Sequence, residues 1–159
     1  MSLPNSPRPD LQVVLDAQGA LLDAARPEAV ARQHARGRLT VREVIAGLAD
    51  ADSFVEYGGL APPALRDKSG PADGLGMGTA PVQGRAVGLV LYDYTVHGGT
   101  QSAINHIKIA RMFEHALRHR LPVICWLEGG GARTHDMLVP ARGASATFVV
   151  FARLSGRVP

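Results

Sequence analysis

The sequence predicts an α/β fold, and three observations lead to that prediction. Two nearly continuous apolar runs, Ala86–Val96 and Pro122–Glu128, are typical of strands that are buried on both faces. Each run ends at a cluster of glycines, and the segment between them, Gln101–Arg120, has apolar residues at helical spacing. Strand, glycines, helix, strand and glycines form a βαβ pattern. At 159 residues and 46% hydrophobic composition, the chain suits one domain with its own core.

The first third of the chain is predicted to be mostly helical. After a polar, proline-rich start, helices are expected over Leu11–Ala24 and Pro27–Arg36, because Pro27 is well placed to begin a helix and Gly37 to end one. Thr40 and Glu43 have the spacing of a capping box and predict a short amphipathic helix after them. We therefore expect a leader and N-terminal helix over residues 1–26, and a domain over 27–159.

The middle and the end of the chain have a different pattern. Residues 58–74 are rich in proline and glycine and are predicted to be a long loop. Leu75–Val82 and Ala86–Val96 flank Gln83-Gly84-Arg85, which predicts a β-hairpin. A further apolar segment lies within Ala144–Val158, and no additional buried strand follows it to finish the sheet edge. This pattern favours a truncated chain or one completed by a partner.

Composition excludes several classes of function. The net charge of +3 suits a small anionic ligand, and the dispersed arginines and 5% aromatic content offer no stacking platform for nucleic acid. No apolar run reaches about 18 residues, so no membrane span is expected. The single cysteine, Cys125, excludes an internal disulfide and fits a reducing cytoplasm. We expect a cytoplasmic protein that binds neither nucleic acid nor membrane.

The two glycine clusters are the strongest candidates for chemistry. Ligands of open α/β sheets bind at the carboxyl ends of the strands, where both clusters lie. Backbone N–H groups from two such loops can form an oxyanion hole. No Ser, Cys or Lys nucleophile is evident beside them, which favours stabilisation of an enolate over covalent catalysis. On this chemistry alone, ordinary tight turns are the simpler interpretation.

Three motifs in order resemble acyl-CoA carboxylase carboxyltransferases. Arg36–Glu43 (RGRLTVRE), followed by Asp52–Glu56 (DSFVE), is similar to their amino-terminal signature. Tyr92–Thr100 (YDYTVHGGT) resembles the family's DFTVxGGS, and Glu128–Arg133 (EGGGAR) resembles its DSGGAR. The similarity runs over about residues 30–159, although the loop at 60–73 matches poorly.

The resemblance implies a crotonase-like fold of stacked ββα units, here incomplete. Members transfer a carboxyl group from carboxybiotin to the α-carbon of an acyl-CoA through a thioester enolate. By the matching motifs, the catalytic backbone donors would be Gly98, Gly99, Gly130, Gly131 and Ala132. The implied partners are a biotin carboxylase, a biotin carboxyl carrier protein and further copies of the chain.

The resemblance also implies a second half-domain for the biotin side, which would follow this segment. The isolated chain is therefore expected to be inactive in carboxyl transfer. Two alternatives stay open. One is a non-catalytic fragment that serves in assembly or docking, and the other is an acyl-CoA decarboxylase subunit, which shares the motifs.

Several side chains are candidates for substrate contact. Arg36 and Arg38, with Arg42 nearby in sequence, form a basic cluster that could face CoA phosphates, or else a solvated helix end. His97, Thr100 and Arg133 adjoin the glycines, and Arg133 could instead form a structural ion pair. His115 and His119 have the spacing of metal ligands, but a solvated helix face is expected and no metal is predicted. Cys125 and Trp126 are expected in the core.

Overall fold

A computed structural model describes residues 8–65, 69–137 and 146–159. They form a mixed α/β arrangement around a four-stranded sheet of order β1-β2-β3-β4. The strands are β1 (Val55–Glu56), β2 (Leu75–Val82), β3 (Arg85–Tyr92) and β4 (Val123–Trp126). The helices are α1 (Pro9–Gly19), α2 (Pro27–His34), α3 (Val41–Leu48), α4 (Ala103–His119), α5 (Thr134–Met137) and α6 (Ala146–Leu154).

Local sequence signals determine where most of these elements begin. The capping box before α3 is confirmed: the Thr40 hydroxyl accepts from the Glu43 N–H, and the Glu43 carboxylate accepts from the Thr40 N–H. A second capping box, which the sequence analysis did not anticipate, joins Ser102 and Asn105 at the start of α4. The first predicted helix is shorter than expected and ends at Gly19.

The predicted hairpin and the parallel strand pair are both confirmed. β2 and β3 pair antiparallel around a two-residue turn at Gln83 and Gly84, both with positive φ. β3 then pairs in parallel with β4, and α4 forms the crossover between them. The hairpin with α4 is a ββα unit of the kind that the resemblance implied. β3 ends at Tyr92, four residues before the predicted end of the run.

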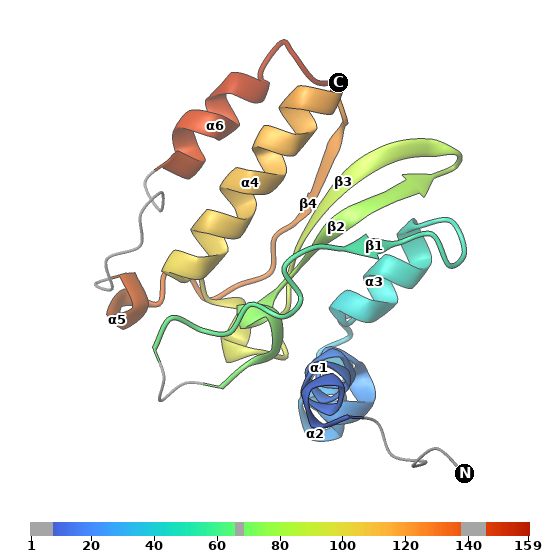
Figure 1. The fold of residues 1–159 in the computed structure, drawn as a ribbon, viewed down its shortest axis with the longest axis vertical. Helices are drawn as coiled ribbons and strands as arrows, with labels where there is room; N and C mark the ends of the chain where they lie inside the picture. Colours follow the sequence, from blue (N-terminus) through green and yellow to red (C-terminus); the bar gives the residue numbers. More distant parts are fainter. Residues whose placement is uncertain (1–7, 66–68, 138–145) are drawn as a thin grey trace.

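Alternation along β3 builds one core on each face of the sheet. Leu89 and Leu91 pack against α3, and Val90 packs against α4 and α6. α4 and α6 lie side by side on one side of the sheet, and α3 lies on the other (Figure 1). Burial on both faces explains why β3 is almost continuously apolar, as predicted.

The prediction of a core position for Cys125 and Trp126 is wrong. Cys125 is exposed, and Trp126 retains 39% of its accessible surface. β4 is the last strand of the described sheet and pairs only with β3 within the described residues, so its far edge is open. An apolar strand thus lies at an edge where only its first residues are covered.

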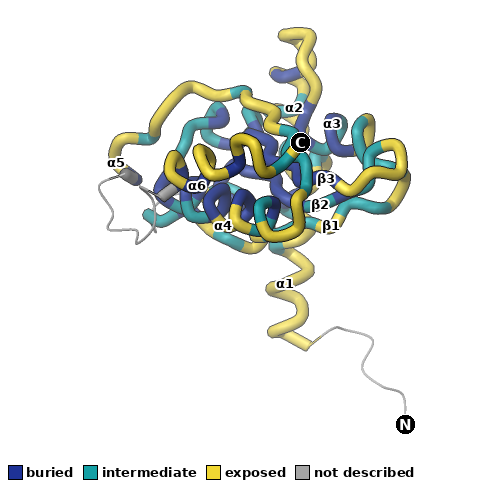
Figure 2. The backbone as a smooth tube through the Cα atoms, turned by 90° about the horizontal axis from the view of Figure 1, so that it is seen from above, coloured by how far each residue is buried: buried dark blue, intermediate teal, exposed yellow. Residues whose placement is uncertain are grey.

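The N-terminal helix contributes nothing to either core. α1 has no buried residue, and it projects away from the body of the molecule (Figure 2). Its exposed apolar side chains are Leu11, Val13, Val14 and Leu15. Among the described residues, no helix has the length and hydropathy needed to cross a membrane.

Two glycine substitutions should shift stability in opposite directions. A Cβ at Gly78 would collide with the Val55 carbonyl oxygen of the paired strand β1, so Gly78→Ala should lower the free energy of unfolding by about 1–3 kcal/mol. Gly47 lies in α3 with no atom near its missing Cβ, so Gly47→Ala should raise it by up to about 1 kcal/mol. Urea unfolding of both variants checks this, and effects of the same sign would contradict it.

Candidate functional site

The two glycine loops lie in direct backbone contact at the carboxyl ends of β3 and β4. The Gly130 N–H donates to the Gly98 carbonyl at 3.0 Å, and the Gln101 N–H donates to the Gly131 carbonyl at 2.8 Å. A parallel bridge between Gln101 and Ala132 continues the contact. The convergence predicted from the sequence is therefore confirmed.

Glycine is required here for loop-to-loop contact. A Cβ at Gly99 would collide with the Glu128 carbonyl oxygen, and a Cβ at Gly129 would collide with the Gly99 carbonyl oxygen. Gly98 and Gly131 differ, since no atom lies within 4 Å of a Cβ placed on either; both have positive φ, as Gly99 does. Gly99 and Gly129 thus allow the loops to come into contact, whereas Gly98 and Gly131 border open space.

The five backbone donors expected from the sequence divide into two groups. The N–H groups of Gly99 and Gly130 donate to the carbonyls of Val96 and Gly98, each at 3.0 Å, and are used within the fold. The N–H groups of Gly98, Gly131 and Ala132 donate no hydrogen bond within the part of the chain that the structure describes. The set available to a ligand oxygen therefore narrows to these three, and a cavity shared by them stays a prediction.

A cationic and aromatic surface adjoins the second glycine loop. The guanidinium groups of Arg36 and Arg38 lie over the Tyr94 ring, at 5.2 and 5.8 Å from its centroid. Arg38 also pairs with the Glu128 carboxylate at 2.8 Å, and buried Gln33 donates to the same carboxylate. A hollow of about 610 Å³ opens beside this surface, lined by Gly37, Arg38, Leu39, Trp126, Leu127, Glu128 and Gly129.

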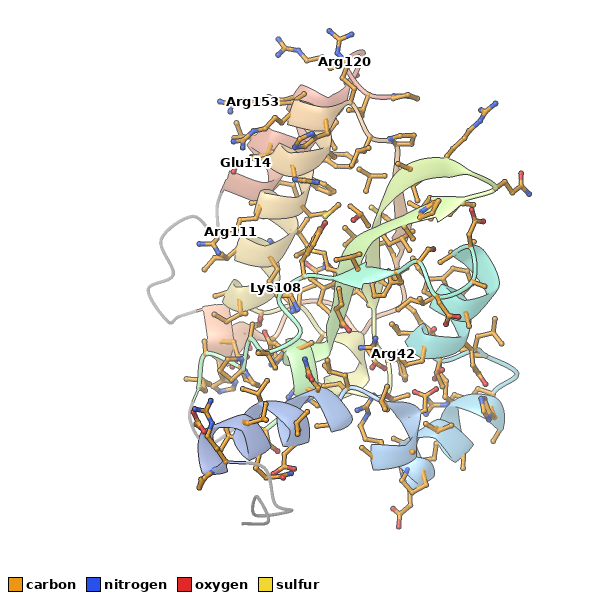
Figure 3. The ribbon with its side chains drawn as sticks, turned by 45° about the vertical axis from the view of Figure 1, so that its right-hand side comes forward. Arg42, Lys108, Arg111, Glu114, Arg120 and Arg153 are labelled. Atoms are coloured by element: carbon orange, nitrogen blue, oxygen red, sulfur yellow. The ribbon has the colours of Figure 1, made fainter. Side chains whose placement is uncertain are left out.

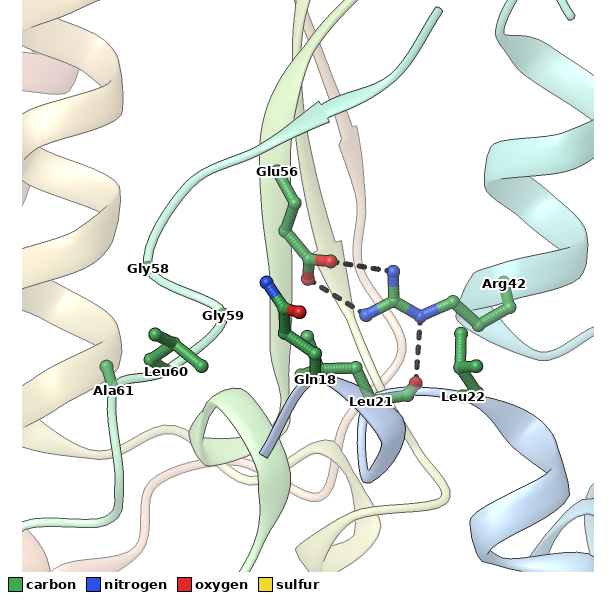
Figure 4. Close-up of a pocket in the computed structure, with 9 residues that line it drawn as sticks. All are labelled: Gln18, Leu21, Leu22, Arg42, Glu56, Gly58, Gly59, Leu60 and Ala61. Carbon is green, nitrogen blue, oxygen red and sulfur yellow. Dashed lines mark hydrogen bonds and ion pairs between the residues drawn. The ribbon is translucent and has the colours of Figure 1, made fainter. Parts of the chain in front are cut away.

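Arg42 does not belong to this basic surface, contrary to the grouping suggested by the sequence. Its guanidinium makes two parallel bonds to the Glu56 carboxylate, at 2.8 and 2.9 Å, and a third to the Leu21 carbonyl (Figure 4). The pair lies on the wall of a separate hollow of about 510 Å³. Arg42 thus ties α3 to β1 and to the turn after α1.

His97 and Thr100 shape the first glycine loop. His97 is half-buried and has a positive φ of 52°, which is unusual for a residue with a side chain. Its carbonyl accepts from both the N–H and the hydroxyl of Thr100, at 3.2 and 2.7 Å. Contact of either side chain with a substrate stays a prediction.

Arg133 forms a structural ion pair, which was one of the two roles predicted for it from the sequence. Its guanidinium bonds the Asp73 carboxylate at 2.8 Å and the Asp136 carboxylate at 2.7 Å. It also donates to the carbonyl and the hydroxyl of Thr100, at 3.1 and 3.2 Å. Arg133 thereby connects the end of the second glycine motif to the end of the first.

Asp73 is the residue near the site that the sequence analysis missed. It is fully buried at the end of the 58–74 loop, where no periodicity or motif marks it. Its carboxylate accepts from Ser102 and Asn105, at the start of α4, as well as from Arg133. A lone Asp between alanine and glycine carries no signal from which these contacts could be inferred.

A buried lysine lies next to this network. The Lys108 ammonium donates to the carbonyls of Ala72 and Leu75, at 2.8 and 2.6 Å. Figure 3 shows Lys108 directed inward from α4, whereas Arg111, Glu114, Arg120 and Arg153 lie at the outer surface. Desolvation by burial lowers the Lys108 pKa to about 8, although the Asp73 charge opposes the shift.

The two helix histidines, His115 and His119, lie side by side. The rings of His115 and His119 are 4.4 Å apart, and Tyr57 contacts the His115 ring edge. Among the described residues, no group of three or more His, Cys, Asp and Glu side chains could hold a metal ion.

Comparison with known proteins identifies a family whose members resemble this chain. The sequence profile of the carboxyl transferase domain matches residues 32–159. The 12S subunit of methylmalonyl-CoA carboxyltransferase from Propionibacterium freudenreichii is 33% identical over 135 residues, which is 82% of this chain and 26% of that protein. The methylmalonyl-CoA decarboxylase subunit alpha of Veillonella parvula is 30% identical over 135 residues, 82% of this chain and 26% of that protein.

Solved structures agree with the sequence relatives. A single-chain, multi-domain long-chain acyl-CoA carboxylase superposes with a TM-score of 0.84 at 43% identity, over 97% of this chain and 17% of that one. The hexameric transcarboxylase 12S, with methylmalonyl-CoA bound, superposes with a TM-score of 0.80 at 26% identity, over 95% of this chain and 31% of that one. The chain spans about a quarter of the length of the curated relatives it matches.

Burial of Lys108 predicts a specific pH dependence of stability. Between about pH 8 and the usual pKa of 10.5, the unfolded chain keeps the proton that the folded chain has lost, so stability should rise with pH. Relative to Lys108→Met, the rise should be on the order of 3 kcal/mol. The raised pKa values of Tyr92 and Cys125 act in the opposite direction, but equally in both proteins. Denaturant unfolding from pH 7.5 to 10.5 measures the difference, and parallel curves would contradict it.

Proposed function

The chain belongs to the carboxyl transferase domain family, and on this premise we propose that it forms the acyl-CoA side of a biotin-dependent acyl-CoA carboxyltransferase. The observation that carries the proposal is the backbone contact between the glycine loops. It brings together, at one sheet edge, Gly98, Gly131 and Ala132, whose N–H groups donate no hydrogen bond to any residue that the structure describes. Such groups suit an oxygen on which negative charge develops.

The chemistry proposed for these donors is stabilisation of an enolate. The α-carbon of the acyl-CoA loses a proton, and the electron pair left behind is delocalised onto the thioester oxygen. Backbone donors about 2.7–3.1 Å from that oxygen lower the energy of the anion without reorganising. The α-carbon would then form its new bond to the carboxyl carbon while the bond from that carbon to a ring nitrogen of biotin breaks. The nitrogen would keep that electron pair and take up the α-proton, and the thioester carbonyl would be restored.

We propose that Arg36 and Arg38 bind the anionic part of CoA. Their guanidinium groups both lie near the Tyr94 ring, and Arg38 also pairs with Glu128, which begins the second glycine loop. Exposed apolar side chains line the hollow next to them, and an adenine or pantetheine group could pack there. The proposed substrate-binding set also includes His97, Thr100 and Arg133, whose contacts determine the shape of the loops.

Carboxybiotin on a carrier partner would supply the carboxyl group. Gly129, Gly130 and Gly131 are exposed, whereas an oxyanion site gains most of its strength when water is excluded. We therefore propose that a further segment or a second copy covers this loop in the working enzyme, which is cytoplasmic and oligomeric. The isolated chain would bind acyl-CoA without transferring carboxyl groups.

Two other functions are candidates for this chain. A decarboxylase relative, 30% identical, favours the reverse reaction, in which loss of carbon dioxide leaves the same enolate on the same donors. The second candidate is a non-catalytic role, in which the chain docks on a carboxylase. Carboxylase and decarboxylase need the same acyl-CoA contacts, so binding tests address both, and a docking fragment would show no acyl-CoA binding.

The proposed CoA site predicts an effect of Arg36. Arg36→Ala should weaken binding of CoA to the full chain by about tenfold, since a charge-assisted phosphate contact is lost. The difference should shrink as salt rises. Arg32→Ala is the matched control, because Arg32 is exposed on α2 and, among the residues that the structure describes, its one ion pair is with Glu28. Isothermal titration at two salt concentrations measures both, and equal affinities for the two variants would remove Arg36 from the site.

The proposed oxyanion site predicts a preference for an enolate-like anion. A CoA derivative that carries a nitronate in place of the thioester should bind more tightly than propionyl-CoA. Gly131→Val should abolish that preference, because valine disfavours the φ of 91° that directs the Gly131 N–H. Loss of this one donor should lower the affinity for the nitronate by about a hundredfold. Cys125→Ala should keep it. Loss of the preference in Cys125→Ala with retention in Gly131→Val would replace the enolate interpretation with a thiol mechanism.

A further inference from the structure

One buried carboxylate contacts both glycine motifs from outside either of them. Asp73 is 0% exposed and lies in the tight turn Pro71–Gly74, just before β2. One carboxylate oxygen accepts from Arg133, which follows the second glycine loop. The other accepts from the Ser102 hydroxyl and the Asn105 amide, which follow the first.

The same partners are joined to one another as well as to Asp73. Ser102 and Asn105 are the two members of the α4 capping box, so the Asp73 contact fixes the start of the helix. Arg133 reaches across to the Thr100 carbonyl, which is two residues from that start. The Asn105 amide also donates to the Asp73 carbonyl at 2.9 Å.

Burial makes this arrangement sensitive to displacement. A buried charge is tolerated when it is paired and hydrogen-bonded, and movement of either loop would remove a partner that no water replaces. The backbone conformation of the turn supports the same conclusion. Ala72 and Asp73 both have positive φ, 50° and 54°, a conformation that persists where the surroundings hold it.

From these contacts we infer that Asp73 is a positioning residue, which sets the spacing of the two loops so that their free N–H groups converge on one oxygen. It touches no substrate and acts through Ser102 and Arg133. This role rests on the proposed function, because the spacing matters for binding only if the loops hold a thioester oxygen. The effect on the loops themselves can be measured without any ligand.

The test uses hydrogen exchange of the amides that join the loops. In the full chain the N–H groups of Gly130, Gln101 and Arg133 donate across the contact. Asp73→Asn keeps the shape of the side chain and removes its charge. These three amides should then exchange at least about tenfold faster than in the wild type, after correction for global stability from the β2–β3 amides.

Asp50→Asn is the matched control. The Asp50 carboxylate also accepts two hydrogen bonds, from the N–H groups of Gln83 and Gly84 at the hairpin turn, far along β2 from Asp73. This variant should lose protection at the turn and keep it at Gly130, Gln101 and Arg133. If Asp73→Asn fails to fold, Arg133→Lys, which keeps a cation but not the several contacts of the guanidinium, should speed exchange at Gly130 and Gln101.

Binding of the nitronate derivative separates this inference from the proposed function. Asp73→Asn should lose at least about tenfold in affinity for the nitronate and none for CoA itself. If the wild type shows no preference for the nitronate, the proposed function fails, and faster loop exchange in Asp73→Asn would still support the link between Asp73 and the loops. Unchanged exchange at Gly130 and Gln101 in either folded variant overturns the positioning role, whatever the binding result.

Discussion

Backbone contact between the Gly98-Gly99 loop and the Glu128–Gly131 loop is the constraint on which the candidate site depends. At Gly99 and Gly129 any side chain would collide with a carbonyl oxygen of the facing loop, so these positions are restricted by the fold. The N–H groups of Gly130, Gln101 and Arg133 donate across the contact and hold it. Gly98 and Gly131, whose N–H groups donate no hydrogen bond within the described residues, border open space, so the same contact assembles the site and leaves these two donors available.

Beneath the loops lies a cluster of buried charged groups, in which positive and negative side chains are paired with each other. Arg133 pairs with two carboxylates, those of Asp73 and Asp136, and the Lys108 ammonium lies close to the same turn. Charges in this setting are costly unless each has partners. The Arg133–Asp73 pair and the contacts of Lys108 join segments that are distant in sequence, whereas Asp136 lies three residues after Arg133. The cluster therefore contributes more to the relative placement of the segments than to overall stability.

The sequence was a good guide where structure depends on local signals. The Thr40 capping box and the hairpin follow from residues close together in the chain, and the parallel strand pair follows from two apolar runs on either side of one amphipathic helix. Exposure of Trp126 did not follow, because burial of a strand depends on what covers its far edge. Asp73 could not be found either, since its partners are 29 to 60 residues away. Motif spacing predicted the loops, but tertiary contacts decide which donors are free.

Exposure of β4 at the sheet edge gives the protein an intrinsic optical reporter. Trp126 is the single tryptophan of the chain, and its half-exposed ring lines the hollow that also contains Gly129. Indole emission depends on the polarity around the ring. A ligand that displaces solvent from this hollow would therefore move the emission to shorter wavelength, and no label or second tryptophan would confuse the signal. Occupancy of the surface beside the glycine loops is thus readable by fluorescence alone.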